Sequence, residues 1–178
     1  MLAIFALLPL LALASASPIQ KRYSGVKIKS GLGDHCLTPL LTQFQEGTPI
    51  TTASCADAKT WDINPGSGSV LLHGTEFAMD AGTGTDNNEI VKLWTSYPGL
   101  FQQTWFYTDD NRIAITGGNQ CLDETNSGPQ TYECTPWNDN QVWNIVESDT
   151  PTSSVTSSVT PVPTGSASVS DNGTVTTF

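Results

Sequence analysis

The most informative part of the chain runs from Cys121 to Ile145 and reads CLDETNSGPQTYECTPWNDNQVWNI. It contains three landmarks in a fixed order. A Cys-Leu-Asp triplet occupies residues 121–123, a Gln-x-aromatic-x-Cys stretch occupies 130–134, and an Asn-Gln-x-Trp stretch ends at Trp143. Similar landmarks occur twice earlier in the chain in the same order, which makes this stretch one unit of an internal repeat.

Three tryptophans end the successive units at spacings of 44 and 38 residues: Trp61, Trp105 and Trp143. The first landmark lies at 36–38, 78–80 and 121–123, and the middle landmark lies at 51–55, 92–96 and 130–134. We therefore predict three repeats of about 40 residues. Because the three tryptophans recur where other landmark residues change, we predict that they belong to the core.

The pattern within each unit is typical of short β-strands. Residues 70–72 and 113–115 are apolar stretches followed by turn-forming residues, and no window carries a helical stripe of apolar residues. The 15 Gly and 11 Pro residues also oppose long helices. Three repeats of four short strands predict a closed, all-β body, because closure removes exposed sheet edges.

Length and charge limit the classes of function. The 178 residues predict one domain with appendages. The 7 basic and 17 acidic side chains give a formal net charge of -10. Nucleic acids and anionic membranes attract basic surfaces, so neither is an expected partner. Only 13% of the residues are charged, and the chain contains five tryptophan residues.

The amino-terminal residues indicate a secreted protein. Residues 2–14 are apolar but too short to span a bilayer, and small residues follow, so we expect a signal peptide at 1–16. The dibasic pair Lys21-Arg22 predicts a pro-segment at 17–22, and two solvated charges are the alternative. No other stretch is long enough for a transmembrane helix, so we expect no membrane span.

The carboxy-terminal residues have a different composition. Between residues 150 and 178, 15 of 29 residues are Ser or Thr, and Asp171 is the one charged side chain. Such a segment cannot bury enough apolar surface to fold, so we predict a disordered, O-glycosylated tail. Asn172 begins an N-glycosylation sequon. No GPI signal is expected, because the tail has no hydrophobic end. The globular domain is then 23–149.

The four cysteines are expected to form disulfides in an oxidising compartment, and four cysteines allow three pairings. The repeat selects one of them. Each repeat has two equivalent positions, held by Cys36 and Cys55, by Ala78 and Ser96, and by Cys121 and Cys134, so the middle repeat has lost both cysteines together. We therefore predict the pairs Cys36–Cys55 and Cys121–Cys134. Each closes a short loop and contributes about 3 kcal/mol in the chain-entropy model.

The three landmarks resemble the repeat of the ricin B-chain-type β-trefoil lectin domain, also described as a family 13 carbohydrate-binding module. The resemblance covers about residues 26–147. It implies a non-catalytic β-trefoil with up to three shallow sugar sites, one per repeat. It implies glycan partners, with galactose-type or xylan-like sugars as the alternatives. We expect no metal and no cofactor. The leader and tail suggest a fungal protein that is extracellular or associated with the cell wall.

A sugar site needs an aromatic plate for the C–H face of the ring, and a carboxylate and amides for its hydroxyls. The third repeat has the full set, and the second repeat has most of it, with Lys92 and Gln102 as replacements. The first repeat has Thr38 and Ala53 in place of the acid and the aromatic, so we predict that it is structural. The predicted sugar-binding residues are Asp123, Gln130, Tyr132, Asn140 and Gln141 in the third repeat, and Asp80, Trp94 and Gln103 in the second.

Several of these residues have a structural alternative. Gln103 and Gln141 are also suited to buried hydrogen bonds with turns, and Asp80 and Asp123 to turn formation. Trp137 lies near the third set in sequence and has no assigned role.

Other functions fit the sequence less well. A glycosidase needs two carboxylates across a cleft. The adjacent acids Asp109-Asp110 and Asp123-Glu124 fit solvated turns, and His35 and His73 lie in different repeats. Zinc-site spacing and a calcium-loop pattern are missing. The remaining alternative is a trefoil that presents loops to a protein partner, as a protease inhibitor or a structural cell-surface protein does.

Overall fold

The computed structural model describes residues 22–147, in which the chain forms β-strands and two 3₁₀ helices but no α-helix. The predicted signal peptide, nearly all of the pro-segment, the tail and Asn172 lie outside the described residues. Within 22–147, no helix is long and apolar enough to cross a membrane.

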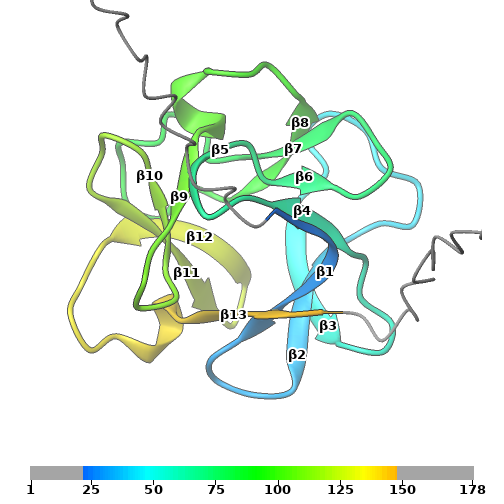
Figure 1. Cartoon of the computed structure of the whole chain (residues 1–178), viewed down its shortest axis with the longest axis horizontal. Coiled ribbons are helices and arrows are strands. Elements are labelled where there is room, and N and C mark those ends of the chain that lie inside the picture. Colours follow the sequence, from blue (N-terminus) through cyan, green and yellow to red (C-terminus); the bar gives the residue numbers. More distant parts are fainter. Residues whose placement is uncertain (1–21, 148–178) are drawn as a thin grey trace, which may run out of the picture. The chain divides into compact units, whose positions relative to one another are not determined.

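The strands follow the three sequence repeats (Figure 1). The first repeat contains β1 (Tyr23–Ser30), β2 (His35–Pro39), β3 (Ile50–Ser54) and β4 (Trp61–Ile63). The second contains β5 (Gly66–Gly68), β6 (Leu71–Leu72), β7 (Phe77–Asp80), β8 (Lys92–Thr95), the helix η1 (Phe101–Gln103) and β9 (Trp105–Tyr107). The third contains β10 (Ile113–Ile115), β11 (Gln120–Thr125), β12 (Gly128–Glu133), the helix η2 (Asp139–Gln141) and β13 (Trp143–Val146).

The second repeat departs from the expected four strands because its first strand is divided in two. β5 pairs with β9, whereas β6 pairs with β4 and β7. The division lies at Ser69 and Val70, where the chain passes from the five-stranded sheet β12-β11-β10-β9-β5 to the larger sheet that contains β1. The other two repeats have four strands each, as predicted.

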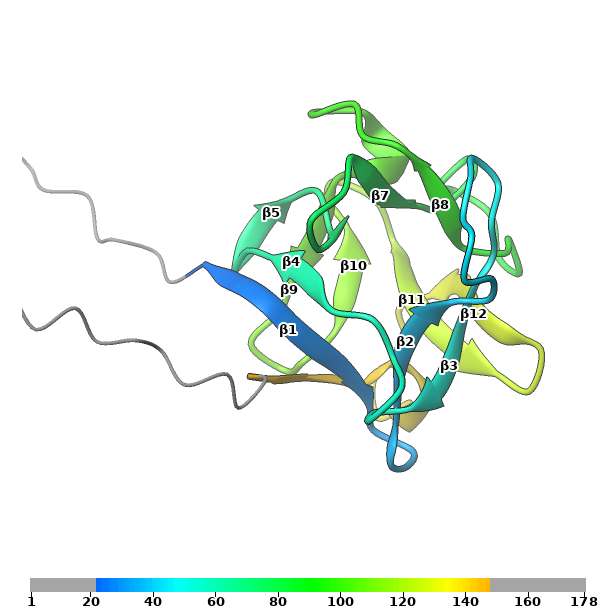
Figure 2. The same ribbon diagram turned by 90° about the vertical axis from the view of Figure 1, so that its right-hand side faces the viewer.

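Each repeat contributes one hairpin with the same register. Thr38 pairs with Thr51 in β2–β3, Asp80 with Lys92 in β7–β8, and Asp123 with Gln130 in β11–β12. The hairpins also contact one another, through a bridge between Pro49 and Lys92 and another between Ile90 and Gln130. Figures 1 and 2 show the three repeats arranged around a common centre, the arrangement of a β-trefoil.

The three repeat tryptophans occupy equivalent places in the core. Trp61, Trp105 and Trp143 are each at most 1% exposed, which confirms the prediction that they are core residues. Each indole Nε1–H donates to the backbone carbonyl of the middle residue of the first landmark, at 2.9 to 3.0 Å: Leu37, Met79 and Leu122. In each repeat, a core tryptophan is therefore hydrogen-bonded to the residue that precedes Thr38, Asp80 or Asp123.

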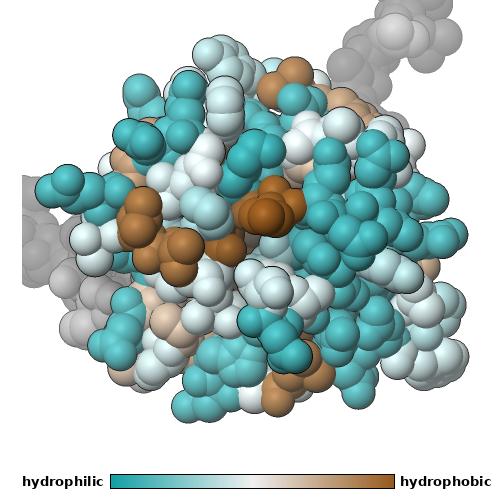
Figure 3. Space-filling model, turned by 180° about the vertical axis from the view of Figure 1, so that it is seen from behind, coloured by the Kyte–Doolittle hydropathy of each residue, from teal (hydrophilic) through white to brown (hydrophobic). Residues whose placement is uncertain are grey.

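Both predicted disulfides are present. Cys36 pairs with Cys55 and Cys121 with Cys134, so each bond lies within one repeat. No cysteine in the described residues is free. Seen from behind, the surface is mostly hydrophilic, with a few separate apolar clusters (Figure 3).

Candidate functional site

The second repeat contains a pocket of about 310 Å³ beside the β7–β8 hairpin. Trp94 and Tyr97 are partly exposed, with Tyr97 at 53%, so both present aromatic surface at the pocket. The predicted residues Asp80 and Trp94 both line it. The full lining is Asp80, Gly82, Lys92, Trp94, Tyr97, Leu100 and Gln102.

Asp80 lies in the wall of this pocket, is only 4% exposed and is held by several donors. The backbone N–H of Gly82 donates to Oδ1 at 2.9 Å, and Gln103 Nε2 donates to Oδ2 at 3.0 Å. Lys92 Nζ lies 3.7 Å from Oδ1. A carboxylate has about four acceptor positions, so lone pairs remain for hydroxyl donors from a ligand.

Gln103 is fully buried and makes the buried hydrogen bonds of the structural alternative. Its Oε1 accepts from the backbone N–H of Tyr97 at 2.8 Å, and its Nε2 donates to the carbonyl of Thr95 at 3.0 Å. The same Nε2 donates to Asp80. One buried amide therefore holds the loop after β8 and orients the carboxylate in the pocket wall.

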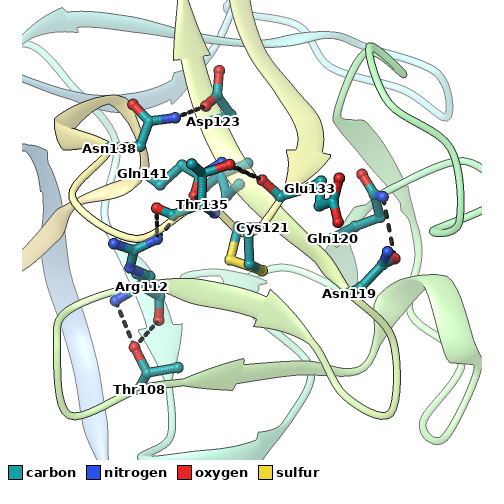
Figure 4. Close-up of a disulfide and its surroundings, with 12 residues drawn as sticks. Thr108, Arg112, Asn119, Gln120, Cys121, Asp123, Glu133, Thr135, Asn138 and Gln141 are labelled. Carbon is teal, nitrogen blue, oxygen red and sulfur yellow. Dashed lines mark hydrogen bonds between the residues drawn. A yellow bond between two sulfur atoms is a disulfide. The ribbon is translucent and has the colours of Figure 1, made fainter.

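In the third repeat, the register places Asp123, Gln130 and Tyr132 on one face of the β11–β12 hairpin, because successive side chains alternate between faces. Asp123 is 4% exposed and Tyr132 is 38% exposed. Asn138 Nδ2 donates to Asp123 Oδ2 at 3.1 Å (Figure 4). The carboxylate and the aromatic ring of this repeat thus share a face.

Gln141 has a different partner from its equivalent Gln103. It accepts from the Thr135 backbone N–H at 2.9 Å and donates to the Glu133 carbonyl at 3.0 Å, as Gln103 does with Tyr97 and Thr95. Its Oε1 also accepts from Arg112 Nη1 at 3.0 Å, and no hydrogen bond joins it to Asp123 among the contacts of the described residues (Figure 4). Gln141 holds the loop, and Asn138 has taken over the contact with the acid.

Asn140 lines a second pocket, of about 400 Å³, on the other side of β11. Glu124 forms part of this pocket and faces away from Asp123, because the two are consecutive in the strand. Glu124 accepts from Ser30, from Thr52 Oγ1 at 3.0 Å, and contacts His35 Nε2 at 2.7 Å. Asp123 and Glu124 therefore do not form a pair of carboxylates facing one cleft.

The first repeat differs in the length of its loop as well as in its residues. Three fewer residues lie between Cys55 and Lys59 than between the equivalent Cys134 and Gln141. Lys59 instead donates its backbone N–H to Thr38 Oγ1 at 3.2 Å. The segment equivalent to Tyr97 and Leu100, which forms a pocket wall in the second repeat, is thus shortened in the first.

Sequence reasoning missed four residues of these sites. Gly82, Tyr97 and Leu100 line the second-repeat pocket, and Asn138 contacts the third-repeat acid. A usable signal was the equal spacing of seven residues from Ser96 to Gln103 and from Cys134 to Gln141, which aligns the two loops. Within 22–147, no group of three or more His, Cys, Asp or Glu side chains has an arrangement that holds a metal ion.

Comparisons with known proteins agree with this architecture. The family model of the ricin-type β-trefoil lectin domain matches residues 24–154. Curated proteins give no significant match to the sequence.

Solved structures with the same fold differ widely in sequence from this chain. ThreeFoil, a designed threefold-symmetric protein, has a TM-score of 0.60 and 18% identity, covering 68% of this chain and 97% of its own. A mutant of the earthworm lectin C-terminal domain, solved with 6'-sialyllactose, has a TM-score of 0.56 and 17% identity, covering 70% of this chain and 99% of its own. GalNAc-T7, solved with UDP, GalNAc and Mn²⁺, has a TM-score of 0.57 and 13% identity, covering 72% of this chain but 23% of its own. The family match spans well over half of the chain and the fold agrees with it, so this protein belongs to the ricin-type β-trefoil lectin domain family.

Proposed function

We propose that this protein is a secreted, non-catalytic lectin that binds glycans at two sites, in its second and third repeats. The observation that carries the proposal is the second-repeat pocket, where a buried and oriented carboxylate, Asp80, lies beside the partly exposed Trp94. An aromatic face and a fixed acceptor are the two groups that a sugar ring needs from a shallow site. Membership of a lectin family supports the same class of ligand.

The third-repeat site is proposed on the same grounds. Asp123 is held by Asn138, and Tyr132 lies on the same face of the hairpin, two residues along β12 from Gln130, the cross-strand partner of Asp123. The first repeat has neither a carboxylate nor an aromatic ring at these positions and has a shorter loop. We therefore assign it a structural role.

The two proposed sites differ in charge. Lys92 contributes an ammonium group to the second-repeat pocket, where the third repeat has the neutral amide of Gln130. Lys92 is a donor for sugar hydroxyls and for the carboxylate of an acidic sugar. The second site is therefore expected to tolerate anionic sugars better than the third.

Secretion is part of the proposal. Two disulfides lie within 22–147, and disulfides persist in oxidising compartments outside the cytosol. A single shallow site is expected to have a Kd of about 1 mM, or about -4 kcal/mol. Two sites on one rigid body gain avidity on a polymer or a glycan-coated surface without any new contact.

The test is a glycan array with the full chain, followed by calorimetric titration with the glycan that binds. We expect two sites per chain, and one site in either Asp80→Asn or Asp123→Asn. Tyr132→Ala should remove the third site without unfolding the protein, because its ring is partly exposed.

Phe106→Ala is the matched control for Tyr132→Ala, because Phe106 is a similarly exposed aromatic residue, at 41%, that does not line the second-repeat pocket. It should leave both sites intact. A folded protein that binds no glycan would exclude the lectin function and favour a trefoil that recognises a protein partner.

A further inference from the structure

The second and third repeats share a turn that precedes the 3₁₀ helix. In the second repeat it is Tyr97-Pro98-Gly99-Leu100, and the Leu100 N–H donates to the Tyr97 carbonyl at 3.0 Å. In the third it is Thr135-Pro136-Trp137-Asn138, and the Asn138 N–H donates to the Thr135 carbonyl at 3.3 Å. Each turn has proline in its second position and a positive φ in its third, as in a type II turn.

The third position of the two turns is occupied by different residues. Gly99 has a φ of 86°, which glycine adopts freely, whereas Trp137 has a φ of 65°, which is unfavourable for a bulky side chain. Trp137 is also 96% exposed, so its ring makes little contact with the rest of the protein. Neither the backbone conformation nor the exposure of this tryptophan helps the protein to fold.

In the second repeat, this turn forms part of the wall of the proposed sugar site. Tyr97 and Leu100 line the second-repeat pocket on either side of Gly99. In the third repeat Asn138 stands where Leu100 does, donates to Asp123 at 3.1 Å, and accepts from the Asn140 N–H at 3.1 Å at the start of η2. Trp137 is therefore next to a residue, Asn138, whose side-chain amide is held through both its nitrogen and its oxygen.

We propose that Trp137 is a second aromatic platform of the third site, where it binds the next sugar ring of an oligosaccharide beyond the ring held by Asp123 and Tyr132. The inference rests on the proposed lectin function. An exposed indole on a hydrogen-bonded turn offers a flat apolar surface to the C–H face of a sugar, and only two side-chain torsions must be ordered on binding. The second site has glycine at this position, so it binds a single ring, and the third site prefers oligosaccharides.

The test replaces Trp137 by the residue that the second repeat carries. Trp137→Gly is made in the Asp80→Asn background, in which only the third site binds. The probes are galactose and lactose, and xylose and xylotriose, titrated by calorimetry and by NMR of the indole N–H signals. We expect Trp137→Gly to weaken binding of the oligosaccharide about tenfold and to change monosaccharide affinity less than twofold.

Two controls separate recognition from folding. Phe106→Ala, in the same background, removes an exposed aromatic ring and should change neither affinity. The thermal unfolding midpoint of Trp137→Gly should not fall, because glycine suits the positive φ. The indole signal that Trp137→Gly removes should shift in the parent protein on adding lactose or xylotriose, and should stay in place on adding the monosaccharide.

The outcomes distinguish this inference from the proposed function. If the Asp80→Asn parent binds these sugars and Trp137→Gly binds them equally well, the second platform is wrong and the lectin function stands. Equal loss of monosaccharide and oligosaccharide binding also overturns it, because Trp137 would then belong to the first ring's site. If the parent binds none of the four sugars while folded, the proposed third site fails and the inference fails with it.

Discussion

The side-chain amide of Gln103 donates to Asp80 Oδ2 at 3.0 Å, and this bond connects the interior of the protein to the wall of a surface pocket. Gln103 is fully buried, and its other contacts hold the loop after β8. The position of the carboxylate therefore depends on the same interactions that stabilise the fold. A rigid acceptor of this kind loses little entropy when a ligand binds.

We predict that Gln103→Ala weakens both folding and binding. It leaves the Tyr97 N–H and the Thr95 carbonyl without their partner, which lowers the free energy of unfolding by about 2 kcal/mol. It also frees Asp80, so affinity at the second site should fall at least about tenfold, equivalent to about 1.4 kcal/mol. Urea denaturation and calorimetry in the Asp123→Asn background measure the two effects.

Gln141→Ala is the matched control in that background. It removes the same two loop contacts in the third repeat, from Thr135 and to Glu133, together with the hydrogen bond from Arg112, but no bond to an acid. It should lower the free energy of unfolding by at least as much as Gln103→Ala and leave the second site unchanged. If both variants leave second-site affinity intact, the bond from Gln103 has no role in binding.

The middle repeat should accept a third disulfide. Ala78 and Ser96 occupy the positions held by cysteine pairs in the other repeats, and Ala78 is fully buried. We expect Ala78→Cys with Ser96→Cys to oxidise on folding and to raise the free energy of unfolding by about 3 kcal/mol. Thiol titration and denaturation with and without reductant check this. Free thiols in the folded protein would contradict the equivalence of the three repeats.

The two turns should respond oppositely to substitution. Gly99→Ala places a Cβ at a φ of 86° and is expected to lower the free energy of unfolding by about 1 kcal/mol. Trp137→Gly removes a bulky side chain from the equivalent position, which also has a positive φ. The free energy of unfolding of this variant should therefore equal that of the parent or exceed it by up to about 1 kcal/mol. Chemical denaturation measures both. A large loss of stability in Trp137→Gly would mean that the indole supports the fold.

Asp62 should make stability depend on pH in the acidic range. Burial by itself raises the pKa of Asp62, but hydrogen bonds from the Ser24 hydroxyl, the Gly25 N–H and His73 outweigh burial and lower the pKa below 3.8. A carboxyl whose pKa is lower in the folded state stabilises above its unfolded pKa, and this contribution disappears as pH falls through the folded pKa.

Asp62→Asn is the test. We expect it to be less stable than the parent at pH 6, by under about 1 kcal/mol because the group is partly exposed to solvent. The difference should shrink as the pH falls through the folded-state pKa of Asp62, where the parent's carboxyl becomes protonated. Thermal unfolding across this range measures it, and a difference that grows toward low pH would contradict the direction of the pKa shift.

Much of the fold could be predicted from spacing along the chain. The repeat predicted a disulfide between Cys36 and Cys55 and another between Cys121 and Cys134, and the structure has both bonds. Three recurring tryptophans indicated a core, and all are buried. These features depend on the register within a hairpin, which is set by local alternation of side chains.

The partners of individual polar side chains could not be predicted in this way. Gln103 and Gln141 occupy equivalent positions, yet one bonds an aspartate and the other an arginine. Asn140 matched the family motif but lines the pocket of Glu124, while Asn138 contacts Asp123. Such choices depend on side-chain rotamers and on neighbours from other repeats.

The sequence by itself therefore determined the repeat, the disulfide pairs, the core tryptophans and the faces that carry Asp80 with Trp94 and Asp123 with Tyr132. All of these follow from the repeat of about 40 residues and from the alternation of side chains along each strand. The tertiary structure decided which amide orients each acid, that Glu124 turns away from Asp123, and that Trp137 stands exposed on a strained turn. These depend on three repeats meeting in space, where a residue's partner lies at no fixed distance along the sequence.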